Sequence, residues 1–196
     1  ASYTDGGGAG ESMASGATSA IANVNDLPTG SVTVTGTATQ NQTLTATNTL
    51  GDVDGLGTIS YQWQSSPDGT TRSNIGGATA STYILTEAQV GQQIRTLASY
   101  TDGHGTAESK LSAATAAIAN VNDAPTGSVT VSGTTTQNQT LTASNTLADA
   151  DGLGTISYQW QSSPDGTTWS NIGGATASTY VLAEAQVGKQ VRAVAS

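Results

Sequence analysis

The sequence predicts an all-β protein made of tandem β-sandwich repeats with a period of 97 residues. Comparing residues 1–97 with residues 98–194 leaves 20 differences in 97 positions, so 77 positions are identical. Short alternating segments recur at about 8–12-residue spacing with turn residues between them, which is typical of an all-β sandwich. A repeat of this length is one ordinary domain with its own core, and the high identity indicates duplication within an array.

The centre of each repeat is a strand with an inward-facing tryptophan. The segment 54–71, D-G-L-G-T-I-S-Y-Q-W-Q-S-S-P-D-G-T-T, returns letter for letter 97 residues later. Its middle alternates, so that Ile59, Tyr61 and Trp63 share one face. A tryptophan at the middle of an inward face is typical of a two-sheet core. We therefore expect Trp63 and its counterpart Trp160 to be buried core residues.

The repeat phase predicts three parts of the chain. Residues 1–24 are the last strand of a preceding repeat, residues 25–122 a complete repeat, and residues 123–196 a repeat that lacks its last strand. Pro28 and Pro125 mark the linkers, because proline cannot donate to a sheet. The expected strands, from the start of the chain to the end of the first repeat, are 12–22, 31–35, 42–47, 58–65, 82–85, 92–100 and 109–119.

The strand that is surplus at the start of the chain is the one missing at its end. Three explanations remain open: the chain is a piece of a longer array, residues 1–24 complete the second repeat of another copy, or the repeat phase is different. An open sandwich edge exposes backbone and core, so we expect a linear array in either of the first two forms. Strand donation to the next copy would be head to tail, and such a contact generates a fibre because it does not close.

Composition excludes several classes of function. The formal net charge is −9, whereas nucleic acids and anionic membranes attract lysine and arginine. No cysteine is present, which excludes thiol catalysis, disulfides and thiolate metal sites. No apolar run approaches the roughly 20 residues of a transmembrane helix. We therefore expect no nucleic-acid partner and no membrane insertion.

Residues that could perform catalysis are scarce. His104 is the single histidine, and Gly7 stands at its counterpart position. Serine and threonine are abundant, but no base is available to activate them. The aspartate pairs Asp52/Asp54 and Asp149/Asp151 each lie within one loop, whereas a glycosidase places its carboxylates across a cleft. We therefore expect that the chain is not an enzyme.

The motifs taken together resemble a known family. The second repeat begins with V-N-D-A-P-T-G and continues with Q-T-L-T-A-S-N-T-L-A-D-A-D-G, I-S-Y-Q-W-Q occurs in both repeats, and V-G-Q-Q-I-R-T-L-A-S-Y-T-D-G closes the first. Across the whole chain these residues are similar to the tandem immunoglobulin-like (cadherin-like) repeats of giant bacterial surface adhesins of the RTX type. The resemblance implies immunoglobulin-like sandwiches on the outside of a bacterial cell. It also implies an extender role, in which the repeats hold a terminal adhesive domain away from the cell.

Oxygen-bearing side chains gather in the linkers and in two loops. Two aspartates at positions i and i+2 of a glycine-bounded loop are typical of hard-cation sites. In an immunoglobulin-like sandwich the loops after the second and sixth strands lie where the first strand enters. The N-x-N-D-x-P linker is similar to the cadherin calcium pattern, with asparagine in place of its first aspartate. We therefore expect calcium, held by Asn23, Asn25, Asp26, Asp52, Asp54 and Asp102 at the first linker and by Asn120, Asn122, Asp123, Asp149 and Asp151 at the second. The opposite pole of the first repeat could add Asp68 and Glu87.

Two alternatives stay open. Aspartate and asparagine in turns also hydrogen-bond their own backbone, so the same residues could be turn formers without a metal. Trp169, whose counterpart is Arg72, could be a sugar-stacking platform or a surface aromatic that covers an edge. The sequence thus predicts a structural extender of a bacterial surface adhesin or filament, assembled head to tail and calcium-stiffened. A carbohydrate- or protein-binding immunoglobulin-like module is the alternative.

Overall fold

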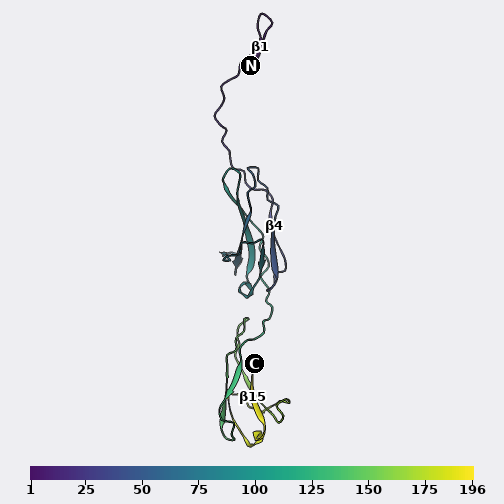
Figure 1. Ribbon diagram of the computed structural model, residues 1–196, viewed down its shortest axis with the longest axis vertical. Coiled ribbons are helices and arrows are strands. Elements are labelled where there is room, and N and C mark those ends of the chain that lie inside the picture. Colours follow the sequence, from purple (N-terminus) through teal and green to yellow (C-terminus); the bar gives the residue numbers. More distant parts are fainter. The chain divides into compact units, whose positions relative to one another are not determined.

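The computed structural model describes residues 1–196 and is all-β, with antiparallel sheets and no α-helix (Figure 1). The chain divides into two compact units. Unit 1 comprises Ala1–Ala38, Gln42–Ile84 and Gln92–Ala117, and unit 2 comprises Thr39–Asn41, Leu85–Gly91 and Ile118–Ser196. Two short segments of the first sequence repeat therefore belong to unit 2. No helix in the structure has the length and apolar character needed to span a membrane.

Unit 1 contains two sheets and a separate hairpin. The three-stranded sheet has the order β3-β4-β7, with β3 at Val32–Thr35, β4 at Thr43–Asn48 and β7 at Thr82–Ile84. The four-stranded sheet has the order β6-β5-β8-β9, with β5 at Ser60–Ser66, β6 at Ser73–Asn74, β8 at Gln93–Thr101 and β9 at Ala107–Leu111. The hairpin pairs β1, Ser2–Thr4, with β2, Gly10–Ser12.

Unit 2 repeats this arrangement with one strand fewer. One sheet has the order β10-β11-β14, with β10 at Val129–Ser132, β11 at Thr140–Asn145 and β14 at Thr179–Val181. The other has the order β13-β12-β15, with β12 at Tyr158–Ser163, β13 at Ser170–Asn171 and β15 at Gln190–Ala195. Single-turn 3-10 helices η1, Glu87–Gln89, and η2, Glu184–Gln186, complete this unit. Strand β15 is at the edge of its sheet, whereas its counterpart β8 is covered by β9.

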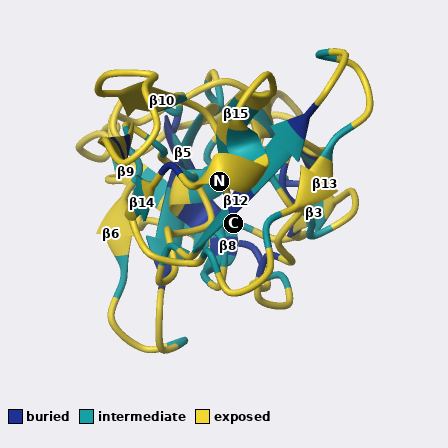
Figure 2. Cartoon of the chain, turned by 90° about the horizontal axis from the view of Figure 1, so that it is seen from below, coloured by how far each residue is buried: buried dark blue, intermediate teal, exposed yellow.

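The two tryptophans form the cores, as the sequence predicts. Trp63 on β5 and Trp160 on β12 are both 0 % exposed. The Trp63 indole N–H donates to the carbonyl oxygen of Ala80 at 2.9 Å, and its ring lies 5.8 Å from that of Tyr83. Trp160 has a matching indole bond of 2.8 Å. Most buried positions, dark blue in Figure 2, lie on the strands, and most loop residues are exposed.

The core of unit 1 joins its two sheets. Strand β8 alternates as predicted, with Ile94, Thr96 and Ala98 completely buried on one face. Ala98 and Tyr100 from this sheet pack with Val32 of the other sheet and with the nearby Leu50. A pleated strand places alternate residues on opposite faces, so local alternation alone was sufficient to predict this inward row.

Two predicted strands are shorter than expected, and two short elements were not predicted. The strand expected at 12–22 extends only to residue 12, and residues 13–22 are in no strand. An extended segment becomes a strand only when a neighbour pairs with it, and alternation does not provide that neighbour. The strand expected at 109–119 is β9, which ends at Leu111, and only isolated bridges follow at residues 117–119. Strand β6 was not predicted, and it forms because Gln64 and Ser65 of β5 pair with it. Helix η1 was not predicted either.

Candidate metal centre

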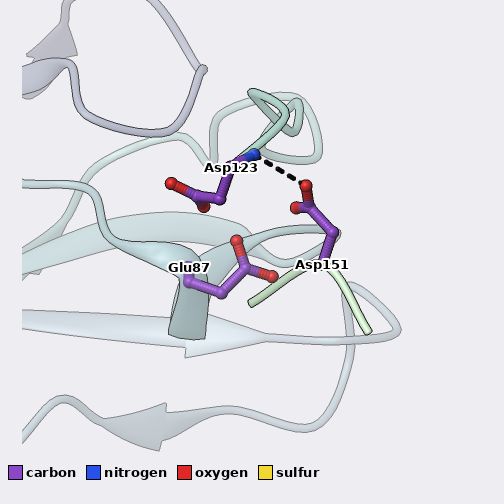
Figure 3. Close-up of side chains that lie close together, drawn as sticks. All are labelled: Glu87, Asp123 and Asp151. Carbon is purple, nitrogen blue, oxygen red and sulfur yellow. Dashed lines mark hydrogen bonds between the residues drawn. The ribbon is translucent and has the colours of Figure 1, made fainter. Parts of the chain in front are cut away.

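Three carboxylates converge in unit 2. Glu87, Asp123 and Asp151 each offer an oxygen, and these three atoms lie within 4.8 Å of one another (Figure 3). Glu87 begins helix η1, Asp123 lies in the segment before β10, and Asp151 lies in the loop between β11 and β12. Three segments that are distant in sequence therefore supply one ligand each. The set could hold a metal ion.

Glu87 carries the unsatisfied atom of this group. Its Oε2 is fully buried and has no hydrogen-bond partner. The helix that positions it is preceded by its N-cap residue Thr86, whose backbone N–H donates to the Gln89 side chain at 3.1 Å. A buried carboxylate oxygen without a donor is costly, and a bound cation would remove that cost. The residues present therefore fit a metal.

Hydrogen bonds orient the two aspartates. Asp151 accepts from the side-chain amide of Asn120 at 2.8 Å and from the backbone N–H of Asp123 at 2.8 Å. Asp123 accepts from the Gln40 side-chain amide at 2.9 Å. Gln40 is 3 % exposed, and its side-chain oxygen Oε1 accepts from the Val121 backbone N–H at 2.9 Å. These bonds hold the carboxylates in place without neutralising them.

Donor chemistry indicates which metals would suit the site. All three groups are carboxylates, and no nitrogen or sulfur ligand takes part. Hard cations such as Ca²⁺ and Mg²⁺ prefer oxygen ligands, whereas imidazole and thiolate favour zinc and copper. Three like charges at this separation also repel one another unless a cation lies between them.

The structure brings together only part of the predicted ligand set of the second linker. Asp123 and Asp151 meet, and Asn120 supports them through its amide. Asn122 instead donates to the carbonyl oxygen of Asp123, and Asp149 accepts from the backbone N–H of Asp151. The bond of Asp149 is that of an aspartate that closes its own turn, so Asp149 and Asn122 stand outside the trio.

At the first linker the aspartates are placed in the same way but form no such trio. The backbone N–H of Asp26 donates to Asp54 at 2.7 Å, as that of Asp123 does to Asp151. Asp52 accepts from the Asp54 backbone and from the Tyr100 hydroxyl. Burial and the bond to Asp52 raise the pKa of Tyr100 well above its usual range. No glutamate corresponding to Glu87 lies beside these groups.

The remaining predicted ligands of the first linker have other partners. The Asn25 amide donates to Glu108 at 2.8 Å, and Asn23 is exposed. Asp102 closes its own turn by accepting from the backbone of His104 and Thr106. Burial opposes its ionisation, but these N–H groups lower the pKa of Asp102 below its usual value.

The two additional candidates, Glu87 and Asp68, have different roles in the structure. Glu87 joins the trio, whereas Asp68 lies in the turn after β5, where it accepts from the backbone N–H groups of Thr70 and Thr71 at 2.8 and 2.7 Å. The sequence did not point to Gln40, which anchors Asp123. Its counterpart Gln137 is exposed, so residue type alone carries no signal for this role.

Comparison with known proteins gives a family without an assigned function. Residues 29–121 and 127–196 match the model of a family described as a domain of unknown function, DUF8696. No curated protein matches the chain. Since the two matches cover most of the sequence, the chain belongs to the DUF8696 family and carries that domain twice.

Proposed function

We propose that the chain is a non-enzymatic extender segment, made of tandem immunoglobulin-like β-sandwich repeats, of a bacterial extracellular adhesin or surface filament. The observation that carries the proposal is the position of the acidic trio in the sequence. Glu87 lies in the first family match, Asp151 in the second, and Asp123 between them. A calcium ion held by all three would fix the linker to loops of both repeats, which is what a stiff spacer requires.

Sheet pairing and core composition support the immunoglobulin-like interpretation. In each unit two antiparallel sheets are present, and an inward tryptophan on one sheet fills the core. In unit 2 that tryptophan packs with Leu141 and Ala143 of the other sheet and with Leu182. Such two-layer packing around a tryptophan is typical of immunoglobulin-like domains.

A thermal melt with calcium and with chelator tests the metal. Extracellular calcium sites bind at about 10⁻⁴–10⁻³ M, so about 10 mM Ca²⁺ would stabilise the folded state by about 1.4–2.7 kcal/mol. We expect a rise of several degrees in the melting temperature of unit 2. Glu87→Gln should remove the rise, because the substitution takes away the one ligand that lacks a donor.

Glu184→Gln is the matched control. Glu184 begins η2 as Glu87 begins η1, but it belongs to no acidic trio. Its substitution should leave the calcium response unchanged. A wild-type chain whose melting temperature is the same in calcium and in chelator would show that the aspartates are turn formers. Small-angle scattering then measures whether calcium stiffens the chain.

The alternative, a carbohydrate-binding module, has less support. Trp169 would be the stacking platform, but the guanidinium carbon of Arg192 lies 4.2 Å from the centroid of its ring. A cation already covers one face of the indole, and this contact alone accounts for the residue. Glycan-array binding that Trp169→Ala abolishes would favour the alternative.

A further inference from the structure

We propose that unit 1 carries a binding site for a small oxyanion, formed by Arg72 and Arg95 on the outer face of the sheet β6-β5-β8. The ligand would be a sulfate or carboxylate group, either as a free ion or as the single acidic group of a small molecule. The inference goes beyond the proposed extender role, and the site shares no residue with the acidic trio.

The pleat of the sheet places both arginines on the face that points away from the core. Trp63 points inward and is completely buried, so its neighbour Gln64 points outward. Gln64 pairs with Arg95 of β8 on one side and with Asn74 of β6 on the other. Residues directly opposite each other on paired strands share a face. Arg72 lies two residues before Asn74, so it belongs to this face as well.

Hydrogen bonds hold Arg95 by one edge of its guanidinium group. Its Nε donates to Oε1 of Gln64 at 2.8 Å, and the Gln64 amide donates to Oδ1 of Asn74 at 2.9 Å. This row of bonds does not use the two terminal nitrogens of Arg95, which can donate to two oxygens of one anion. Because the row already fixes the side chain, less of its freedom is lost when an anion binds.

Arg72 carries an unsatisfied donor. Its Nη2 donates to the Gly69 carbonyl oxygen at 2.9 Å, whereas its Nη1 is buried and has no hydrogen-bond partner. A buried donor without an acceptor is costly. An anion oxygen at this nitrogen would remove that cost.

The two guanidinium groups repel each other without a carboxylate to separate them. Burial and the nearby charge of Arg72 lower the pKa of Arg95. The one ion pair of the structure joins His104 and Asp54, although the chain has 14 acidic and 5 basic residues. An anion beside the two arginines would relieve their repulsion. The net charge of −9 repels polyanions, and this favours a ligand with one acidic group.

The second repeat shows what the site depends on. Trp169 stands at the counterpart position of Arg72, and the guanidinium carbon of Arg192 lies 4.2 Å from the centroid of its ring. Arg192 donates to Gln161 at 2.7 Å, and Gln161 donates to Asn171 at 2.8 Å. The row of hydrogen bonds is therefore the same in both repeats. The first repeat differs by having a second cation where the other has an aromatic ring.

An NMR titration with sodium sulfate tests the site in the 196-residue chain. Sodium chloride is adjusted to keep the ionic strength constant, because screening alone changes the interactions of exposed charges. The Nε–H signals of Arg72 and Arg95 should shift along one saturable curve, whereas that of Arg192 should not. A thermal melt is a poor readout here, because sulfate stabilises folded proteins in general.

Three substitutions give the loss, the control and the gain of the site. Arg72→Trp copies the second repeat, where tryptophan fits beside the same neighbours, and it should weaken sulfate binding at least about tenfold. Lys110→Gln is the matched control, because it also removes one positive charge from unit 1 but its amine bonds to the Pro28 carbonyl oxygen. It should leave binding unchanged. Trp169→Arg should create the same pair in unit 2 and add a second binding event.

Acetate and glucuronate distinguish the source of the anion, since both present a carboxylate. Tighter binding of glucuronate than of acetate would identify the acidic group of a sugar as the ligand, and equal binding would identify a free ion. Arginine signals that shift with none of the three anions would overturn the proposal. Sulfate binding that survives Arg72→Trp, or that Lys110→Gln weakens equally, would overturn it too, as would a Trp169→Arg chain with no second binding event.

Discussion

Replacing Trp63 by alanine should bring unit 1 close to unfolding at 25 °C. The side chain is completely buried, and burying an aromatic of this kind removes about 150–250 Å² from water. At about 25 cal/mol per Å² this contributes about 4–6 kcal/mol. Truncations of buried aromatics to alanine cost about 3–5 kcal/mol. Domains of this size are stable by about 5–15 kcal/mol, so the loss is a large part of the total.

The indole N–H adds a smaller contribution. Its bond to the Ala80 carbonyl oxygen is worth about 1 kcal/mol, and leaving that oxygen unpaired costs about 1–3 kcal/mol. Trp63→Phe should therefore destabilise unit 1 by less than Trp63→Ala, because phenylalanine still fills most of the volume beside Tyr83. The order of stability is expected to be wild type, then phenylalanine, then alanine.

Differential scanning calorimetry measures both variants. The melting temperature of unit 1 should fall by about 12–40 °C for Trp63→Ala, at about 4–8 °C per kcal/mol. Trp160→Ala should act in the same way on unit 2. Trp169→Ala is the control, with a change within about 1 kcal/mol because it loses one cation–π contact to the exposed Arg192. A Trp63→Ala chain that melts within a few degrees of wild type would refute the core assignment.

Two further predictions concern a linker and a turn. Gly30 has φ +79°, and an added Cβ would clash with the Thr49 carbonyl oxygen, so Gly30→Ala should destabilise unit 1 in urea titrations. Gly77 has φ +72° and open space around it. Gly77→Ala should therefore lower the free energy of unfolding only by the roughly 1 kcal/mol that the left-handed conformation costs an alanine. Equal losses of stability in the two variants would contradict the clash at Gly30. Backbone N–H groups of Thr168 and Thr167 lower the pKa of Asp165 far below its usual value of about 3.9. This contribution is present above the unfolded-state pKa and is lost as the pH falls through the folded-state pKa. Wild type should therefore lose stability more steeply than Asp165→Asn between pH 5 and 2 in acid titrations followed by circular dichroism, and parallel curves would argue against it.

The part of the fold that could be predicted from sequence depends on local geometry. Alternation along 58–65 and 92–100 was sufficient to place Trp63 and Ile94 inward, because neighbouring side chains on a strand point to opposite faces. Strand β6 and helix η1 could not be predicted in this way. Each depends on a partner or a cap that lies elsewhere, and their own residues show no periodic pattern.

In the candidate metal centre, too, the sequence predicted the residues with a local pattern and missed those that depend on distant contacts. The paired aspartates and the linker pointed to Asp123 and Asp151, because carboxylates in glycine-bounded loops are a local signal. The sequence suggested Glu87 only as an additional ligand from the opposite pole of the first repeat, and it did not suggest Gln40. Both come within reach of Asp123 only when chain segments distant in sequence pack together, and no spacing rule describes that approach.

Residues 15–22 and 112–119 show most clearly what the sequence determines and what only the tertiary structure determines. The sequence by itself determined a 97-residue repeat, an all-β chain, inward tryptophans and acidic linkers, since all of these follow from composition and local alternation. Only the tertiary structure decided that Ile118 is buried and Ile21 exposed, although their neighbours are nearly identical. Burial requires a surface to pack against. Ile118 pairs with Val90 and accepts a bond from Gly91, whereas residues 13–22 are in no strand or bridge.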